Sequence, residues 1–343
     1  ELLGADARVL RGDARQPAAA LRRDFPSGVR GFVVSNELPD AFGVHKLILS
    51  AKGDVEVVLV VPRIEAALAG KLPAALATSC RETDAQLRSA FRWELHPGAW
   101  LLDRHSFGAV MTCIYARSQA ETGPLLNQVW FDEVRVPACY FEPLLELLRA
   151  GAEPYARALG RENSGVVQYV NVHARRYVRD LAQVLAAGQI MTIDYGDTTA
   201  GLVQGARRGK FPFRVYCDEG DYHPRANHPY TWPGSQDLTA DVNFTDLALA
   251  GLGAGLELVY YGPERALAGA ELPRVIASAD QKPFAKFVGN SVFKLLVLGR
   301  DAAWCPKGKG LEAWPVLSDD AGLEAAEQPL ASIVERLTSS SDL

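Results

Sequence analysis

Residues 31–46 read GFVVSNELPDAFGVHK, a short apolar run that passes directly into polar side chains. Residues 31–35 are rich in β-branched and aromatic side chains, which predicts a strand buried on both faces of a parallel sheet. Asn36, Glu37 and Asp40 follow at the carboxyl end of this strand, where open α/β sheets bind their ligands. The stretch therefore predicts an α/β fold with a candidate site at this strand end.

Two interpretations of these acidic residues are open. Pro39 suits the first turn of a helix, and a helix there would place Glu37 and Asp40 on one side, facing a cleft. The same residues fit an N-cap with acidic first-turn side chains, which stabilise a helix through its dipole. This stretch alone favours neither a functional pair nor an ordinary helix start.

The composition excludes several classes of protein. The chain has 343 residues, of which 48% are hydrophobic and 22% are charged, values typical of a soluble globular protein. No apolar run reaches the roughly 20 residues that span a membrane. A net charge of −5 does not support nucleic-acid binding. The 5 cysteines are scattered and form no Cys-x-x-Cys pair, which favours a reducing compartment.

Strand and helix patterns alternate along the first part of the chain. Residues 7–14 read as a strand, and residues 17–24 read as a short helix that leads to the strand at 31–35. Residues 47–49 and 55–61 predict a β-hairpin.

The pattern recurs in the second half. Residues 170–187 have helical periodicity, and Gly188 is expected to end that helix. Residues 189–193 predict a strand that again runs into polar side chains, Asp194 and Tyr195. An antiparallel edge hairpin is expected from residues 256–261 and 291–298.

Four motifs occur in order over most of the chain: NELPDA at 36–41 with VH at 44–45, IDYG at 193–196, PGSQDLTADVNF at 233–244 and FKLL at 293–296. Together they resemble the MidA family of S-adenosylmethionine-dependent methyltransferases, which includes a mitochondrial protein-arginine methyltransferase that assists complex I assembly. The resemblance implies a Rossmann-like class I methyltransferase sheet, a mostly helical insertion, and S-adenosyl-L-methionine as the cofactor.

The sequence also departs from the family pattern. Pro39 stands where another apolar residue is usual, Gly43 stands where proline is usual, and GPER at 262–265 replaces a Ser-Gln pair before phenylalanine. The Gly-rich loop after the first strand and the acidic residue that binds the ribose are missing from this sequence. We expect that strand and loop to precede residue 1 in the intact protein; the alternative is a degenerate relative that binds the cofactor poorly.

The expected organisation has four parts. Residues 1–61 form the first part of the methyltransferase core, and residues 62–165 form an insertion that covers the substrate. Residues 166–305 complete the core, and residues 306–343 form a C-terminal tail region.

The resemblance implies a cofactor site made by Asp13, Ala14, Asn36 and Glu37. Asp13 is expected to bind the adenine amino group, while Ala14 leaves room for the ring. The alternative for Asp13 is an ordinary turn aspartate.

Catalysis is expected from Glu37, Asp40 and Asp194. Two carboxylates can bind a guanidinium by forked hydrogen bonds and help to remove its proton, and Glu37 is the first choice as base or clamp. Asp237 and Asp241 are spaced i, i+4, so on a helix they would share a face. Substrate-binding candidates in the same cleft are His45, Tyr195, Gln236, Asp237 and Asp241, each with capping, turn or packing as its alternative.

The expected acceptor is a nitrogen or oxygen of a protein side chain, arginine by family precedent, or of a peptide-like or small molecule. The rival is a non-catalytic binding or assembly factor that retains the fold. Neither nucleic acid nor a membrane is an expected partner, a homodimer is open, and the family places the protein in a bacterial cytoplasm or the mitochondrial matrix. No metal is expected, because the spacing of one polar cluster matches no standard zinc pattern: Cys217, Asp221, His223 and His228.

Overall fold

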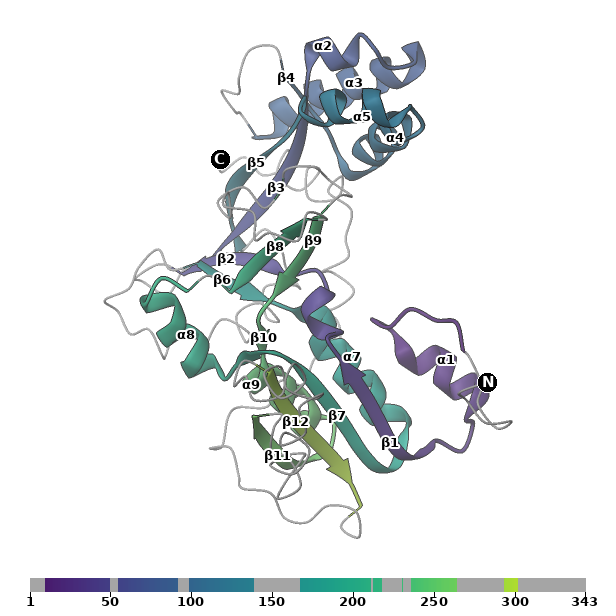
Figure 1. Cartoon of the computed structure of the whole chain (residues 1–343), viewed down its shortest axis with the longest axis vertical. Coiled ribbons are helices and arrows are strands. Elements are labelled where there is room, and N and C mark those ends of the chain that lie inside the picture. Colours follow the sequence, from purple (N-terminus) through teal and green to yellow (C-terminus); the bar gives the residue numbers. More distant parts are fainter. Residues whose placement is uncertain are drawn as a thin grey trace, which may run out of the picture.

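The computed structural model of the chain describes residues 10–49, 55–91, 99–138, 167–210, 212–217, 230, 236–263 and 293–301. Two sheets lie in separate lobes, and the second lobe stands beyond the carboxyl ends of the core strands β1 and β7 (Figure 1). None of the described helices is both long and apolar enough to span a membrane.

The core sheet has five described strands. Four of them follow the order β1 (Val29–Asn36), β7 (Leu185–Asp197), β12 (Phe293–Arg300) and β11 (Glu257–Pro263), and the short β10 (Val242–Asn243) also pairs with β7. β1 and β7 are parallel, whereas β12 is antiparallel to both of its neighbours. The chain is therefore an α/β protein with a mixed sheet, and the expected strands and late antiparallel hairpin are confirmed.

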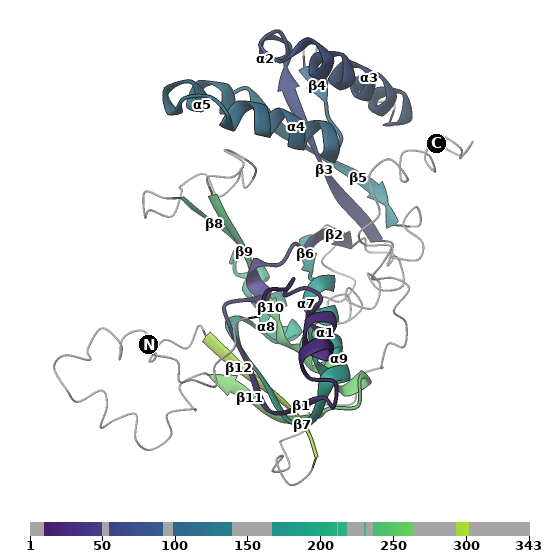
Figure 2. The same ribbon diagram turned by 90° about the vertical axis from the view of Figure 1, so that its right-hand side faces the viewer.

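Three helices lie on one face of the core sheet: α7 (Val172–Val184), α9 (Phe244–Gly253) and α1 (Pro17–Asp24), which packs beside α7 (Figure 2). Their apolar side chains join Ile190 and Leu298 in one buried cluster. From Ile190 onward, every second side chain of β7 points into this covered face, as the two-residue period of a strand requires.

Two expectations about the core strands are wrong. α7 ends at Val184 and β7 begins at the next residue, so Gly188 lies inside the strand rather than at a helix end. Gly188 pairs with Gly31 of β1 at a close approach of the two backbones. Phe32 and Val34 are 58% and 61% exposed, because β1 has a described neighbour on one side only.

The second sheet is antiparallel. Its order is β4 (Ala99–Leu101), β3 (Val55–Glu65), β2 (His45–Leu49) and β6 (Val167–Val170), and β5 (Val129–Pro137) also pairs with β3. The pairing of β2 with β3 confirms the hairpin expected early in the chain.

Four helices accompany this sheet: α2 (Ala66–Ala69), α3 (Ala74–Phe91), α4 (Arg104–Tyr115) and α5 (Gln119–Leu126). Their apolar side chains bury Ile64, near the end of β3, in a second core. Residues 62–165 thus contribute both helices and strands, and the sheet also takes β2 and β6 from outside that range.

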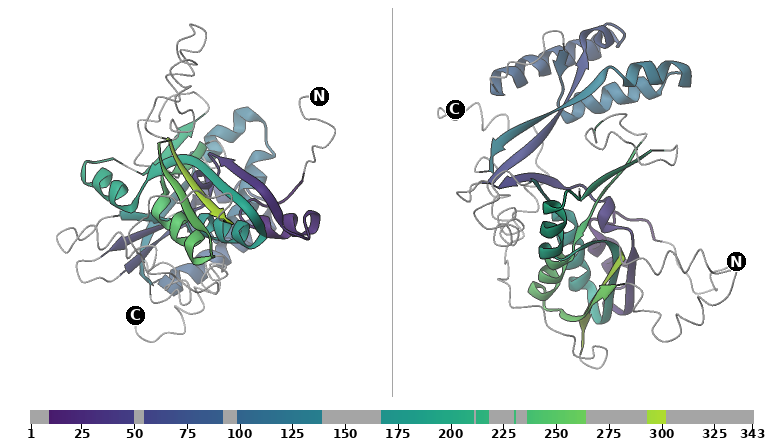
Figure 3. Two further views of the ribbon diagram at one scale, coloured as in Figure 1. Left: turned by 90° about the horizontal axis from the view of Figure 1, so that it is seen from below. Right: turned by 60° about the vertical axis from the view of Figure 1, so that its left-hand side comes forward.

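A two-stranded ribbon lies between the two lobes in the views of Figures 1 and 3. It consists of β8 (Phe213–Cys217) and β9 (Gln236–Ala240), which follow α8 (Thr199–Arg207), and Phe213 stacks on Tyr169 of the second sheet. β10 (Val242–Asn243) then pairs with the end of β7.

The ribbon corrects one conditional expectation: Asp237 and Asp241 would share a face on a helix, but residues 236–240 form the strand β9. Residues i and i+4 share a face in a strand as well as approximately in a helix, so the spacing alone did not distinguish the two. A second correction concerns residues 7–14. Their described part, residues 10–14, is not a strand but runs into a turn closed by a hydrogen bond from Gln16 N to Asp13 O.

Candidate functional site

The candidate site lies where β1 and β7 end side by side. Asn36 pairs with Ile193 in the parallel register, so Glu37 and Asp194 are the next residues on neighbouring strands. The backbone N–H of Glu37 donates to the carbonyl of Ile193 at 2.9 Å, which holds the two chain segments together. The sequence prediction that polar side chains from these two strand ends meet is therefore correct in geometry.

Asp194 is fully buried, because the period of β7 places it on the helix-covered face with Ile190 and Thr192. Its two carboxylate oxygens accept backbone hydrogen bonds, one from Tyr195 N at 2.7 Å and the other from Asp40 N at 3.1 Å. These contacts tie the segment after β1 to the end of β7. Asp194 thus acts as a structural brace, meaning a buried side chain that links two backbone segments by hydrogen bonds.

Asp40 belongs to the 3₁₀ helix η1 (Pro39–Ala41), which confirms a helical turn beginning at Pro39. Asn171, the N-cap of α7, donates to the Pro39 carbonyl at 2.8 Å and anchors this turn. The Asp40 side chain is buried, and its Oδ1 atom has no hydrogen-bond partner among the residues that the structure describes. An unpartnered buried carboxylate oxygen is costly, so a ligand that donates a hydrogen bond there would remove the cost.

Glu37 differs from Asp40, because it precedes the turn and adopts a left-handed backbone with φ of 48°. Its side chain is exposed and accepts a hydrogen bond from Asn36 Nδ2 at 3.3 Å. The two carboxylates therefore do not lie one turn apart on a helix, but they remain close enough that the charge of Glu37 raises the pKa of Asp40.

Burial, followed by the nearby Asp40, raises the pKa of Asp194 to about 8. Burial is also the largest cause that raises the pKa of Asp40. Two buried carboxyl groups that lie close together do not both ionise readily. The Asp40 and Asp194 pair therefore keeps one proton at pH values well above the ordinary pKa of a carboxyl group.

Replacing Asp194 with asparagine tests this pairing through stability. At pH 5 the variant is expected to be less stable by about 1–3 kcal/mol, because an amide cannot accept both backbone N–H groups. Between the ordinary pKa of 3.8 and about 8, the folded state keeps a proton that the unfolded state releases. The stability of the wild type therefore falls as pH rises, by up to about 1.4 kcal/mol per pH unit.

The deficit of Asp194→Asn should accordingly shrink from pH 5 to pH 8 when unfolding is followed in urea at each pH. Glu82→Gln removes an exposed carboxylate from α3, in the other lobe, and serves as the control. A deficit of Asp194→Asn that stays constant over this range would contradict the shared proton.

Tyr195, one residue after Asp194 on β7, places an aromatic ring beside the acidic residues. Its ring lies 4.2 Å from the Phe293 ring on β12, and the Arg214 guanidinium lies 4.8 Å from its centroid. Burial raises the pKa of the Tyr195 phenol, and the nearby Glu37 carboxylate raises it further.

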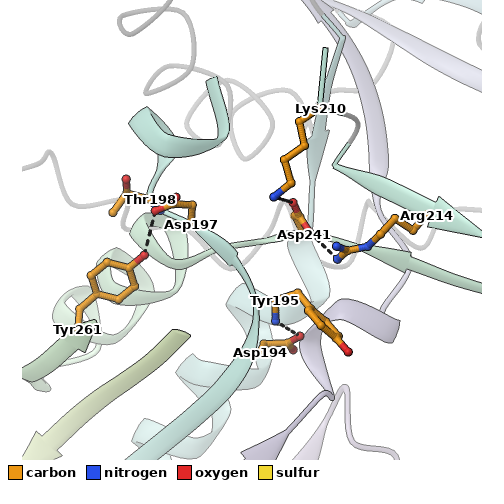
Figure 4. A network of polar contacts seen from close by, with 8 residues as sticks. All are labelled: Asp194, Tyr195, Asp197, Thr198, Lys210, Arg214, Asp241 and Tyr261. Atoms are coloured by element: carbon orange, nitrogen blue, oxygen red, sulfur yellow. Dashed lines mark hydrogen bonds and ion pairs between the residues drawn. The ribbon is translucent and has the colours of Figure 1, made fainter. Parts of the chain in front are cut away.

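The ribbon presents one face toward these groups. Arg214, Tyr216 and Asp237 alternate onto that face, and each acts electrostatically on Tyr195 or Asp40. The buried Asp241 forms ion pairs with Arg214 and, at 3.1 Å, with Lys210 (Figure 4). Sequence analysis missed Arg214 and Tyr216; the usable signal was an arginine inside the apolar run FRVYC, where a charge needs a partner.

The other predicted cofactor residues lie in the turn before α1. Asp13 binds the Arg15 guanidinium through both oxygens at 2.7–3.2 Å and is partly exposed, and this ion pair lowers its pKa to about 2. Ala14 packs at the edge of the main core.

His45 begins β2, where burial and the nearby His173 lower its pKa to about 4, so it is neutral at physiological pH. Gln236 begins β9 and is partly buried. Asp197, two residues beyond Tyr195, accepts hydrogen bonds from the backbone N–H of Thr198, the N-cap of α8, and from the Tyr261 hydroxyl, away from the acidic pair (Figure 4).

Within the described ranges, His, Cys, Asp and Glu side chains form no group of three suited to a metal. Of the polar cluster considered above, Asp221, His223 and His228 lie outside those ranges.

A known protein family matches most of this chain. A family model described as "Putative S-adenosyl-L-methionine-dependent methyltransferase" matches residues 18–262. No curated protein matches the chain.

Two crystal structures from Burkholderia thailandensis are similar. One is a superfamily member bound to S-adenosyl-homocysteine, with 21% identity over 80% of this chain and 55% of that one, and a TM-score of 0.46. The other is an uncharacterized protein of the same superfamily, with 20% identity over 82% and 62% of the two chains, and a TM-score of 0.47. The chain thus spans less than two thirds of the length of either protein.

Proposed function

The chain belongs to this family of S-adenosyl-L-methionine-dependent methyltransferases, and from that premise we propose that it methylates a nitrogen of a cationic side chain, with arginine on a partner protein as the first candidate. The observation that carries the proposal is the placement of an exposed Glu37 and a buried, half-satisfied Asp40 directly after β1, where that strand ends beside its parallel neighbour β7. A peptide-like or small-molecule acceptor is the nearest variant of this proposal.

The described residues fit the cofactor by charge. When bound, S-adenosyl-L-methionine supplies a methyl group on a positively charged sulfur. Glu37 and Asn36 are exposed at the end of β1, where a carboxylate stabilises nearby positive charge. Asp13 accepts three N–H groups of Arg15, one from the backbone and two from the guanidinium, so of its about four lone-pair sites about one remains for an adenine amino group.

The same residues suit a guanidinium acceptor. Asp40 Oδ1 offers an unused hydrogen-bond acceptor in a dry position, and Glu37 supplies a second carboxylate for a forked contact. Asp194 cannot reach an acceptor, because it is buried and both its oxygens are occupied. We therefore assign proton removal to Glu37, binding to Asp40 and positioning to Asp194.

Calorimetric titration with S-adenosylhomocysteine tests the cofactor site. The protein is expected to bind with micromolar affinity, and Asp13→Ala to weaken binding about tenfold or more through a lost charged hydrogen bond. Arg15→Ala is the matched control, because it frees the Asp13 carboxylate and should preserve or strengthen binding.

Unchanged affinity in Asp13→Ala would remove that residue from the cofactor site. Transfer of labelled methyl groups to arginine peptides, compared with lysine peptides of the same sequence, tests the acceptor. Binding of the cofactor without transfer to any acceptor would favour the rival function, a non-catalytic binding or assembly factor.

A further inference from the structure

Arg214 links the ribbon to the end of β7 and has no role in the function proposed so far. Its side chain is 15% exposed, and its guanidinium is held by the Asp241 carboxylate, which is 1% exposed. Lys210 approaches the second oxygen of Asp241 at 3.1 Å, although its own side chain is 56% exposed. The buried Asp241 carboxylate thus restricts the orientation of the Arg214 guanidinium (Figure 4).

This fixed guanidinium meets the Tyr195 ring. Phe293 lies 4.2 Å from the ring centroid and Arg214 lies 4.8 Å from it, so both contacts restrict the ring. Cation–π contacts with a desolvated arginine are among the stronger interactions of an aromatic ring, and the planar guanidinium constrains orientation. The Tyr195 hydroxyl lies beside the Glu37 carboxylate, which contributes to the raised pKa of the phenol.

The orientation of the Glu37 side chain depends on contacts of this kind. Its backbone φ of 48° is uncommon for a residue other than glycine, and its side chain is exposed. Asn36 donates a long hydrogen bond of 3.3 Å from its side-chain amide to the Glu37 carboxylate. An exposed glutamate otherwise samples several rotamers, which would lower the fraction in a productive orientation.

We infer that Arg214, fixed by Asp241, is a positioning residue that orients Tyr195 so that its hydroxyl holds the Glu37 carboxylate toward the methyl acceptor. The inference rests on the proposed function, because it assigns Glu37 a role in the reaction. It adds three side chains to the determinants of the rate: Arg214 from β8, Tyr195 from β7, and Asp241 directly after β9. Arg214 also lies near Asp40, where its positive charge lowers a pKa that burial raises.

Arg214→Met tests the inference in two independent ways. In methyl transfer, kcat is expected to fall about tenfold to a hundredfold, while affinity for S-adenosylhomocysteine changes less than about twofold. Tyr195→Phe should have a similar effect, and the double variant should be no slower than the worse single variant, because both changes break one chain of contacts. Arg214→Lys keeps the charge but not the planar stacking and should recover part of the rate.

The second readout needs no turnover. In protein labelled with 3-fluorotyrosine, the fluorine signal lost in Tyr195→Phe is assigned to Tyr195. That signal should shift or broaden in Arg214→Met, in Asp241→Asn and in Glu37→Gln, but not in Arg208→Met, which alters an exposed arginine nearby.

An unchanged Tyr195 signal in Arg214→Met, or additive losses of rate in the double variant, would overturn the inference. A wild type that methylates no acceptor would defeat the proposed function instead, and the fluorine spectra would still report whether Arg214 orients Tyr195. The two failures are therefore distinguishable.

Discussion

Glu37→Gln is expected to lower kcat for methyl transfer by about 100- to 10,000-fold, the range for losing a general base. Glutamine has nearly the same shape and can still bind the Tyr195 hydroxyl, so the loss reflects the missing proton acceptor rather than altered packing. A guanidinium acceptor stays fully protonated at neutral pH, so its nitrogen depends strongly on proton removal.

The measurement is single-turnover methyl transfer with affinity for S-adenosylhomocysteine determined in parallel. Affinity is expected to change less than about threefold, because the cofactor keeps its other contacts. Glu257→Gln on β11 is the matched control, as it removes an exposed carboxylate from the far edge of the core sheet. Full activity in Glu37→Gln would take the base role away from Glu37, and Asp40→Asn would then identify Asp40 as the next candidate.

The strands that carry the site could be predicted from the sequence, because β-branched runs that end in polar residues are a local signal. The runs before Asn36 and Asp194 are both strands, and their parallel pairing brings the two ends together. The pattern could not reveal that Asp194 is a brace. That property comes from the strand period, which turns Asp194 toward α7 and α9 rather than toward solvent.

The features that were missed depend on partners distant in sequence. Arg214 gains its place from Asp241 and Tyr195, and a single arginine between apolar residues does not identify either partner. The strand at 236–240 could not be inferred from the i, i+4 spacing of Asp237 and Asp241, because that spacing fits a strand and a helix alike. Only the pairing of β9 with β8 separates these alternatives.

The backbone at Gly188 also depends on a partner that is distant in sequence. A glycine after a helical pattern is the usual sign of a helix end, so the sequence favoured that interpretation. In the structure Gly188 has a φ of 126° inside β7 and faces Gly31, whose own φ is 137°. Two adjacent parallel strands thus approach at a pair of glycines, which the sequence shows only as two separate residues.

Gly188→Ala is expected to prevent stable folding, whereas Gly31→Ala is expected to be tolerated with a moderate loss. A methyl group at Gly188 would overlap the carbonyl oxygen of Gly31, a backbone atom that cannot move without separating β1 from β7. A methyl group at Gly31 meets no atom within 4 Å, so that variant carries only the strain of a positive φ, about 1–3 kcal/mol.

The two variants share the backbone strain and differ in the clash, so comparing them isolates the close approach of the strands. Urea unfolding followed by circular dichroism should give Gly31→Ala a lower midpoint with an unchanged slope. Gly188→Ala should lose more than about 4 kcal/mol, a large share of the stability of an ordinary domain, and accumulate as insoluble protein. Equal midpoints for the two variants would mean that β1 and β7 do not approach closely at these glycines. The juxtaposition of Glu37 and Asp194, which depends on that pairing, would then lose its structural basis.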